Sequence, residues 1–191
     1  MQSKKISQFL RSFVLLPIAA TTLSTGTMAA PVISTTVSQI QQNIVTPDPA
    51  SIKKALQAEE AQRIDAYFHD RHMPLEGYGA KMVAEADKNG LDWRILPAIA
   101  VRESTGGIHA CKSKKAPNNP FGWGGCKLGF ATMDIAIETI ARNLGGNNPK
   151  TASYYDGDLK DVLETYNGLA VASYADDVMG IMKKVGEYDI S

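Results

Sequence analysis

The sequence predicts a mainly α-helical domain with one long irregular loop. From residue 51 onward, apolar residues recur three and four positions apart, and several segments stop at Gly or Asn-Gly, as amphipathic helices do. No stretch alternates polar and apolar residues over the length of a strand. Residues 104–131 break the helical pattern, because they hold many of the Gly and Pro residues and both cysteines. The prediction is therefore about six helices, with the loop inserted after the most apolar of them.

Residues 1–30 have the layout of a secretory signal peptide. Two lysines form a basic start, residues 13–20 form a short apolar run, and small residues lead to Ala29 and Ala30. An uncleaved membrane anchor is the alternative, but the apolar run is too short to span a bilayer comfortably. We therefore expect an exported protein, periplasmic or extracellular, with no permanent membrane anchor.

Residues 31–50 are rich in Thr, Ser, Gln, Val and Pro, and they predict a flexible linker before a domain over 51–191. Good helix-forming residues then run over 51–68. The inward-facing positions of this helix are predicted to be Ile52, Leu56, Ala61, Ile64 and Phe68.

Two further helices are predicted before the loop. One runs from Pro74 to Lys88, with weakened first turns because glycines lie in them. Asp92 is expected to cap the next helix, which ends with Glu103. Pro97 lies inside this helix and is expected to remove a backbone donor and bend it.

The loop over residues 104–131 contains the only two cysteines of the chain, Cys111 and Cys126. In an exported chain, such a pair predicts a disulfide, and closing a loop of about 15 residues stabilises the fold by about 3 kcal/mol in the chain-entropy model. Two free thiols are the alternative. No metal site is expected, because only His109 is near and nothing completes a four-ligand set. The loop is expected to be irregular or to contain a short hairpin.

Three more helices are predicted after the loop. Thr132 is a good N-cap for the first, which ends at a pair of glycines, and Asp158 caps a shorter one that ends at Asn167. The last begins after Ser173, whose surroundings resemble a capping box. Its apolar stripe is predicted to be Tyr174, Val178, Ile181, Met182 and Val185.

Glu103 is the candidate catalytic residue. On a helix, Leu96, Ile99 and Ala100 share its face, so the carboxyl ends an apolar stripe. Apolar surroundings and a helix C-terminus both disfavour a charged carboxylate. A carboxyl group that keeps its proton near neutral pH is suited to general acid catalysis. The alternative is an ordinary surface glutamate, paired with a nearby arginine.

No Asp or Glu occurs between Glu103 and Asp134. A two-carboxylate glycosidase needs a second acid about 5–9.5 Å from the first, and here it would have to be a residue such as Asp134, Glu138 or Asp156. The same stretch carries five basic side chains, which are His109, Lys112, Lys114, Lys115 and Lys127. These suit an anionic substrate, or they simply favour solubility.

The loop and a later helix end also supply candidate binding residues. Asn119, Phe121 and Trp123 place aromatic rings and an amide among glycines, a combination that suits sugar rings. The alternative is that Phe121 and Trp123 form a small core of the loop itself. Tyr166 and Asn167 either bond to a substrate near the acid or terminate their helix, where Asn is common for backbone reasons.

Composition excludes some classes of protein. The chain has 191 residues, of which 44% are hydrophobic, enough for one domain with a proper core. Without residues 1–30 it keeps 17 basic and 20 acidic residues, whereas a nucleic-acid-binding protein usually has a basic excess. Nothing in the sequence indicates a cofactor.

Three groups of residues, in this order and spacing, resemble a bacterial lysozyme-like domain. They are residues 91–104, which end in Arg-Glu-Ser, residues 119–123, and Tyr166-Asn167 followed by Ser173-Tyr174-Ala175. The chain is similar here, over about residues 66–184, to the glucosaminidase and soluble lytic transglycosylase families that cut peptidoglycan. The resemblance implies a lysozyme-like helical fold.

The resemblance also implies roles for individual residues. Glu103 falls on the catalytic acid, and Ser104 on the residue paired with it. Asn119 to Gly122 match the Asn-x-Phe-Gly pattern of the glucosaminidase branch, and Tyr166-Asn167 match a pair that lines the cleft in the transglycosylase branch. The chain departs from both branches. It lacks the Gly-Leu-Met-Gln motif of the transglycosylase branch, and it has no acid in the loop to match the second carboxylate of the glucosaminidase branch.

Two functions follow as expectations. One is an exported lytic transglycosylase or N-acetylglucosaminidase with a single catalytic glutamate, acting on peptidoglycan or a related N-acetylated glycan. The other is a non-catalytic glycan-binding module of the same fold, which the missing second acid favours. A helical adaptor without a sugar site would need Glu103 to face solvent away from any groove.

Overall fold

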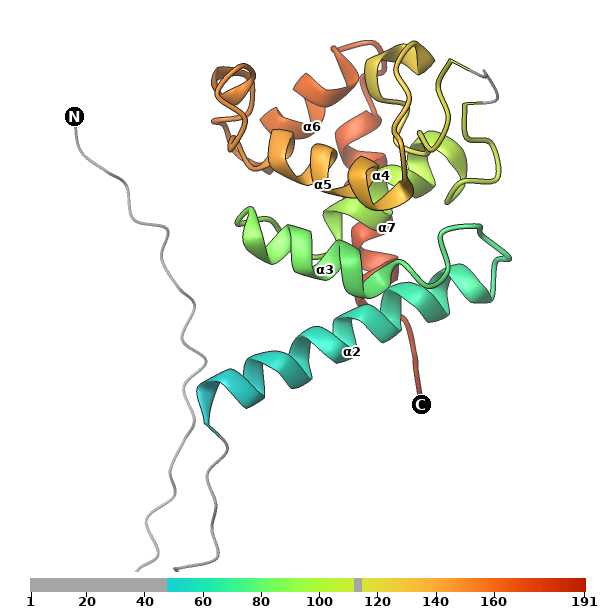
Figure 1. Ribbon diagram of the computed structural model, residues 1–191, viewed down its shortest axis with the longest axis vertical. Helices are drawn as coiled ribbons and strands as arrows, with labels where there is room; N and C mark the ends of the chain where they lie inside the picture. The colour runs from blue at the N-terminus through green and yellow to red at the C-terminus, as the bar shows by residue number, and fades with distance from the viewer. Residues whose placement is uncertain (1–47, 112–114) are drawn as a thin grey trace, which may run out of the picture. The chain divides into compact units, whose positions relative to one another are not determined.

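The computed structural model describes residues 48–111 and 115–191 (Figure 1). The predicted signal peptide, 1–30, and the predicted linker up to residue 47 lie outside this part, as do Lys112 and Lys114. Within it there are six α-helices and no strand, so the helical prediction is confirmed and the described part of the loop forms no hairpin. The helices are α2 (Pro49–His69), α3 (Gly79–Lys88), α4 (Ile95–Ser104), α5 (Met133–Leu144), α6 (Leu159–Asn167) and α7 (Tyr174–Gly186), with short 3-10 helices η1 (Trp123–Cys126) and η2 (Ala152–Tyr154).

Helix α4 lies at the centre of the fold, in contact with α3, α5 and α7 (Figure 1). Seven of its ten residues are buried, and six of these are apolar. A helix that is apolar on most sides has to be covered on most sides.

None of the described helices is both long and apolar enough to cross a membrane. The predicted stripe of α7 is buried at Tyr174, Val178, Met182 and Val185, and Ile181 is partly buried.

Helix α2 packs against α3 and α7 through its C-terminal half. Ala61, Ile64 and Phe68 are buried, as predicted. Ile52 and Leu56 are 47% and 55% exposed, so the prediction that they face inward is wrong. The end of α3 reaches this part of α2, because Lys53 forms an ion pair with Asp87 at 2.8 Å, but it leaves Ile52 and Leu56 exposed.

The first residue of α2 lies inside the predicted linker, 31–50. Asp48 caps the helix, because its side chain accepts hydrogen bonds from the N–H groups of Ala50 at 2.8 Å and Ser51 at 3.1 Å. Pro49 is suited to the position that follows, where its missing N–H costs the helix nothing. The helix therefore begins slightly earlier than predicted.

Helix α3 begins at Gly79 rather than at Pro74. Asp65 of α2 holds this start, because its Oδ1 accepts hydrogen bonds from the N–H groups of Gly77 and Gly79, both at 2.9 Å. A Cβ atom at Gly79 would lie 2.4 Å from the carbonyl oxygen of Ala61. Glycine therefore allows α3 to approach α2 this closely.

The predicted start of α4 needs two corrections. Asp92 does not cap the helix; its Oδ1 accepts a hydrogen bond from the Arg94 N–H at 2.9 Å, in the turn before α4. Pro97 is in the first helical turn, where a backbone N–H has no partner within the helix in any case. It therefore removes no hydrogen bond of the helix.

Two of the three predicted caps after the loop are confirmed. Thr132 accepts a hydrogen bond from the first turn of α5 at 3.2 Å, and Asp158 forms a reciprocal capping box with Asp161. Ser173 makes no such bond. Its φ of −86° and ψ of 1° are outside the extended region that a capping residue adopts, and its hydroxyl donates to Asp177 instead.

We expect Leu96→Ala to lower the free energy of unfolding by about 2–5 kcal/mol, because Leu96 is fully buried and truncation leaves a cavity. Leu56→Ala removes the same atoms from an exposed position and should change this energy by less than about 0.5 kcal/mol. Urea unfolding followed by circular dichroism measures both variants. Equal losses would contradict the different burial of the two leucines.

Candidate active site

The C-terminal end of α4 presents Glu103 and buries Ser104. The helix ends at Ser104, and Thr105 follows with a left-handed backbone (φ 52°, ψ 54°) that turns the chain away. The Ser104 hydroxyl lies 2.7 Å from the carbonyl oxygen of Pro120 and 3.1 Å from that of Ala100, and it accepts a hydrogen bond from a backbone N–H of the following turn at 3.0 Å. Ser104 therefore ties the loop to the end of the helix.

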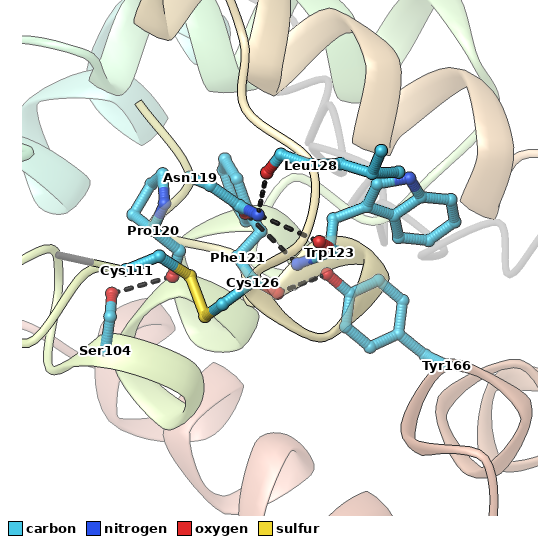
Figure 2. The surroundings of a disulfide bond; sticks show 9 residues. All are labelled: Ser104, Cys111, Asn119, Pro120, Phe121, Trp123, Cys126, Leu128 and Tyr166. Atoms are coloured by element: carbon cyan, nitrogen blue, oxygen red, sulfur yellow. Dashed lines mark hydrogen bonds between the residues drawn. A yellow bond between two sulfur atoms is a disulfide. The ribbon is translucent and has the colours of Figure 1, made fainter. Parts of the chain in front are cut away.

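Asn119 holds the part of the loop that carries Trp123. Its Nδ2 donates to the carbonyl oxygens of Trp123 at 2.8 Å and Leu128 at 2.9 Å, and its Oδ1 accepts from the Trp123 N–H at 3.1 Å (Figure 2). The side chain is only 1% exposed, so water does not compete well for these bonds. Phe121 is fully buried in the core and anchors the same segment.

A disulfide joins Cys111 to Cys126, as predicted (Figure 2). Cys111 lies shortly after the end of α4, and Cys126 is the last residue of η1. The bond therefore anchors the end of the segment that begins with Trp123.

A cavity of about 580 Å³ opens where α4, the loop and the C-terminal end of α6 meet. Its volume is in the range of pockets that bind small molecules. The rings of Trp123 and Tyr166 lie 5.6 Å apart between centroids and tilted by 43°, and they form an aromatic wall. The lining residues are Glu103, Gly122, Trp123, Gly124, Gly125, Leu128, Thr165, Tyr166, Asn167 and Gly168.

The two carboxylate oxygens of Glu103 have different surroundings. Oε1 accepts a hydrogen bond from the hydroxyl of Tyr174 on α7 at 2.6 Å. Oε2 lies against Gly122, because a Cβ atom built there would be 2.5 Å from it. Gly122 also has a φ of 65°, which glycine adopts without strain. Position 122 therefore requires glycine for two reasons.

Tyr166 and Tyr174 are stacked, with ring centroids 6.3 Å apart and planes inclined by 18°. The Tyr166 hydroxyl donates to the carbonyl oxygen of Phe121 at 2.6 Å (Figure 2). Burial is the largest cause of a raised pKa for both phenols, and the neighbouring Glu103 raises each pKa further. Both hydroxyls therefore keep their protons at neutral pH and act as donors.

The structure divides the predicted site residues into two groups. Four of them line the cavity, which are Glu103, Trp123, Tyr166 and Asn167. The others, Ser104, Asn119 and Phe121, are buried behind its wall. The Ser104 and Asn119 side chains bond to backbone groups, and Phe121 packs in the core, so these residues hold the wall rather than face the cavity. Asn167 also serves its own helix end, because its Nδ2 donates to the carbonyl oxygen of Val171 at 3.1 Å.

Sequence reasoning does not identify two residues that contact Glu103. Tyr174 is predicted in the apolar stripe of the last helix and belongs to the residues of the lysozyme-like resemblance, and Gly122 belongs to its Asn-x-Phe-Gly pattern, but neither is predicted to contact the acid. Tyr174 does give one signal, because a buried tyrosine hydroxyl in an aliphatic stripe needs a hydrogen-bond partner. Gly122 gives none, since its role depends on how close α4 comes to the loop.

Glu103 is the only acid among the residues that line the cavity in the described part of the chain. The predicted second acids, Asp134, Glu138 and Asp156, do not line it, and Glu138 lies 3.9 Å from Lys88 of α3. The described basic residues of the loop, His109, Lys115 and Lys127, are exposed and outside the lining. Within residues 48–111 and 115–191, no three His, Cys, Asp or Glu residues are grouped closely enough to hold a metal ion.

The fold and the cavity define an all-helical, disulfide-linked domain with a single carboxylate beside an aromatic wall. No family model, curated protein or solved structure matches the chain.

We expect Gly122→Ala to destabilise the fold more than Gly125→Ala. Both positions have a left-handed backbone, with φ of 65° and 63°, so alanine costs about 1–2 kcal/mol at either. At Gly122 the new methyl also displaces the end of the Glu103 side chain and disturbs its hydrogen bond to Tyr174, which adds about 0.5–1.5 kcal/mol, whereas nothing lies within 4 Å of the corresponding point at Gly125. Urea unfolding compares the variants, and equal losses would show that Glu103 does not rest on Gly122.

Proposed function

We propose that the chain is an exported enzyme with a lysozyme-like fold that cleaves the β-1,4 glycan strand of peptidoglycan or a related N-acetylated glycan. It acts as a lytic transglycosylase or as an N-acetylglucosaminidase. The observation that supports this best is the meeting of Glu103, Trp123, Tyr166 and Asn167 in one cavity, although they come from three separate segments. The same residues contribute to the sequence resemblance to lysozyme-like domains.

The cavity has the chemical groups that a sugar site needs. Trp123 and Tyr166 offer aromatic surface for the C–H face of a sugar ring, and Asn167 and Thr165 offer polar groups for its hydroxyl and acetamido substituents. Apolar walls with a few placed polar groups are the usual composition of a small-molecule pocket. In this proposal Ser104, Asn119 and Phe121 support the wall without contacting the glycan.

In the proposed mechanism Glu103 is both acid and base. It gives its proton to the glycosidic oxygen as the bond from that oxygen to the anomeric carbon breaks. The substrate's own acetamido oxygen then bonds to the anomeric carbon and holds its positive charge, because no second carboxylate of the described residues lines the cavity. In a transglycosylase the muramoyl 6-hydroxyl attacks this carbon, displaces the acetamido oxygen from it and passes its proton to Glu103; in a hydrolase, water does the same.

The proposal of export is supported by two observations. The disulfide between Cys111 and Cys126 is of a kind that persists mainly in oxidising compartments. Residues 1–30 have the signal-peptide pattern.

A non-catalytic glycan-binding module is the second candidate. It is favoured by the single acid of the cavity, one of whose oxygens already accepts a hydrogen bond from Tyr174. In that case the aromatic wall would bind the same glycan, and Glu103 would serve as an acceptor for its hydroxyl groups.

Glu103→Gln should slow the clearing of a cell-wall suspension by at least about 100-fold, because glutamine keeps the shape of the side chain but cannot donate an acid proton. Glu138→Gln is the matched control, since Glu138 does not line the cavity, and it should clear at the wild-type rate. Turbidity measures both variants. A Glu103→Gln protein that clears as fast as wild type would refute the assignment of the acid.

Mass spectrometry of the products from purified glycan strands separates the remaining candidates. A transglycosylase leaves anhydro ends, because the 6-hydroxyl of the substrate attacks, whereas a hydrolase leaves reducing ends. We expect one of these two products with the wild-type protein and neither with Glu103→Gln. Binding of the strands without any product would instead support the module.

A further inference from the structure

We propose that Leu128 is a specificity-determining residue, whose side chain contacts the lactyl methyl group of a muramoyl ring. This inference rests on the proposed function and deepens it, because it concerns the ligand of the same cavity. An N-acetylmuramoyl ring differs from an N-acetylglucosamine ring only in this lactyl ether, which replaces one ring hydroxyl. A residue that contacts the lactyl group therefore separates peptidoglycan from N-acetylated glycans that lack it.

The first argument is that the Leu128 side chain lines the cavity and the protein leaves it uncovered. It is 53% exposed, and it is the only aliphatic hydrocarbon side chain among the described residues that line the cavity. A single exposed leucine is ordinary on a protein surface. This one lies in a concave site, where a ligand that covers it removes apolar surface from water.

The second argument is that the backbone of Leu128 is held beside that of Trp123. The Nδ2 atom of Asn119 donates to the carbonyl oxygens of both residues, at 2.9 Å and 2.8 Å (Figure 2). Asn119 is only 1% exposed, so water competes poorly for these bonds. The Leu128 and Trp123 side chains therefore start from neighbouring points of the backbone, and both line the cavity.

The third argument is that the Leu128 side chain rests against Gly124. A Cβ atom built at Gly124 would lie 2.8 Å from Cδ1 of Leu128 and 3.0 Å from its Cγ. Any other residue at position 124 would push the leucine aside. The hydrogen bond at its carbonyl and the contact at its tip therefore define the position of Leu128 from two sides.

The same short stretch of backbone lies against the acid. Oε2 of Glu103 lies against Gly122, and Leu128 lies against Gly124. These two glycines are at most about 7 Å apart, because a chain extends by no more than about 3.6 Å per residue. A single sugar ring that presents its glycosidic oxygen to Glu103 spans such a separation, and one of its substituents then reaches Leu128.

The lactyl methyl is the substituent that suits this position. In the proposed mechanism the acetamido group is turned to the anomeric carbon, beside Glu103, so its methyl is not available to Leu128. The other substituents of an N-acetylglucosamine ring are polar, and Thr165 and Asn167 offer them partners that a leucine does not. The lactyl ether adds a further methyl group, and its burial against leucine is favourable.

NMR of the bound glycan tests this contact without requiring cleavage. The full chain carries Glu103→Gln, which removes the proposed acid, and it is labelled with 13C at the leucine methyl groups. Adding Leu128→Ala assigns the Leu128 signals. The probes are a tetrasaccharide of alternating N-acetylglucosamine and N-acetylmuramic acid, and chitotetraose, which has no lactyl group. The Leu128 methyl signals should shift more with the first probe than with the second.

The affinities of the variants should show the same preference. Leu128→Ala should weaken binding of the muramoyl tetrasaccharide about fourfold, because it removes the contact of about one methyl group, and it should leave chitotetraose unchanged. Leu128→Met keeps an apolar side chain of similar volume and should bind both glycans as the parent does. Leu56→Ala is the matched control, since Leu56 is 55% exposed and does not line the cavity, and it should change neither affinity.

Equal weakening of both glycans by Leu128→Ala, or weakening of neither, would overturn the inference. Cleavage of glycan strands by the unmutated chain would in that case still support the proposed function. The expected preference without any cleavage by the unmutated chain would support the inference and replace the proposed enzyme by the glycan-binding module. Failure of both glycans to bind would reject the inference together with the proposed function.

Discussion

The buried hydroxyl of Ser104 joins two parts of the chain that the cavity needs at a fixed distance. It lies within hydrogen-bond distance of the carbonyl oxygens of Ala100 in α4 and Pro120 in the loop. Glu103 immediately precedes Ser104, and Gly122 closely follows Pro120. The Ser104 hydroxyl therefore holds Glu103 close to the loop segment that carries Trp123 of the aromatic wall. Asn119 and the disulfide then stiffen the wall on either side of that contact. The Ser104 bonds therefore join the helix end that carries the carboxyl directly to the loop segment that leads to Trp123.

Local chemistry accounts for most of the fold that the sequence predicts. Thr132 and Asp158 begin helices because their side chains bond to backbone groups three residues away. A bond between residues so close in the sequence can be predicted from the local sequence. The exposed Ile52 and Leu56 and the late start of α3 at Gly79 have the opposite origin. The exposure of Ile52 and Leu56 depends on which side of α2 its neighbours cover, and the start of α3 depends on the hydrogen bonds from Gly77 and Gly79 to Asp65 of α2. Both are properties of the assembled fold.

The sequence predicts some residues of the candidate site correctly and misplaces or misses others. The sequence marks Glu103, Trp123, Tyr166 and Asn167 by residue type, and these four line the cavity. It marks Ser104, Asn119 and Phe121 equally strongly, yet these support the wall from behind, because a buried amide or hydroxyl and a ligand-binding one look alike in a sequence. Tyr174 is the reverse case. Its apolar stripe predicts only a core position, and its bond to Glu103 arises because α7 packs along α4.

The close approach of Glu103 to Gly122 has a mechanical consequence. Oε2 touches the backbone at residue 122, and the next peptide unit carries the indole of Trp123. A side chain at position 122 would occupy the space beside this oxygen, so the loop can lie this close to the carboxyl only while residue 122 carries none. The depth of the cavity at the acid is therefore set by bare backbone and not by a side chain that could turn aside.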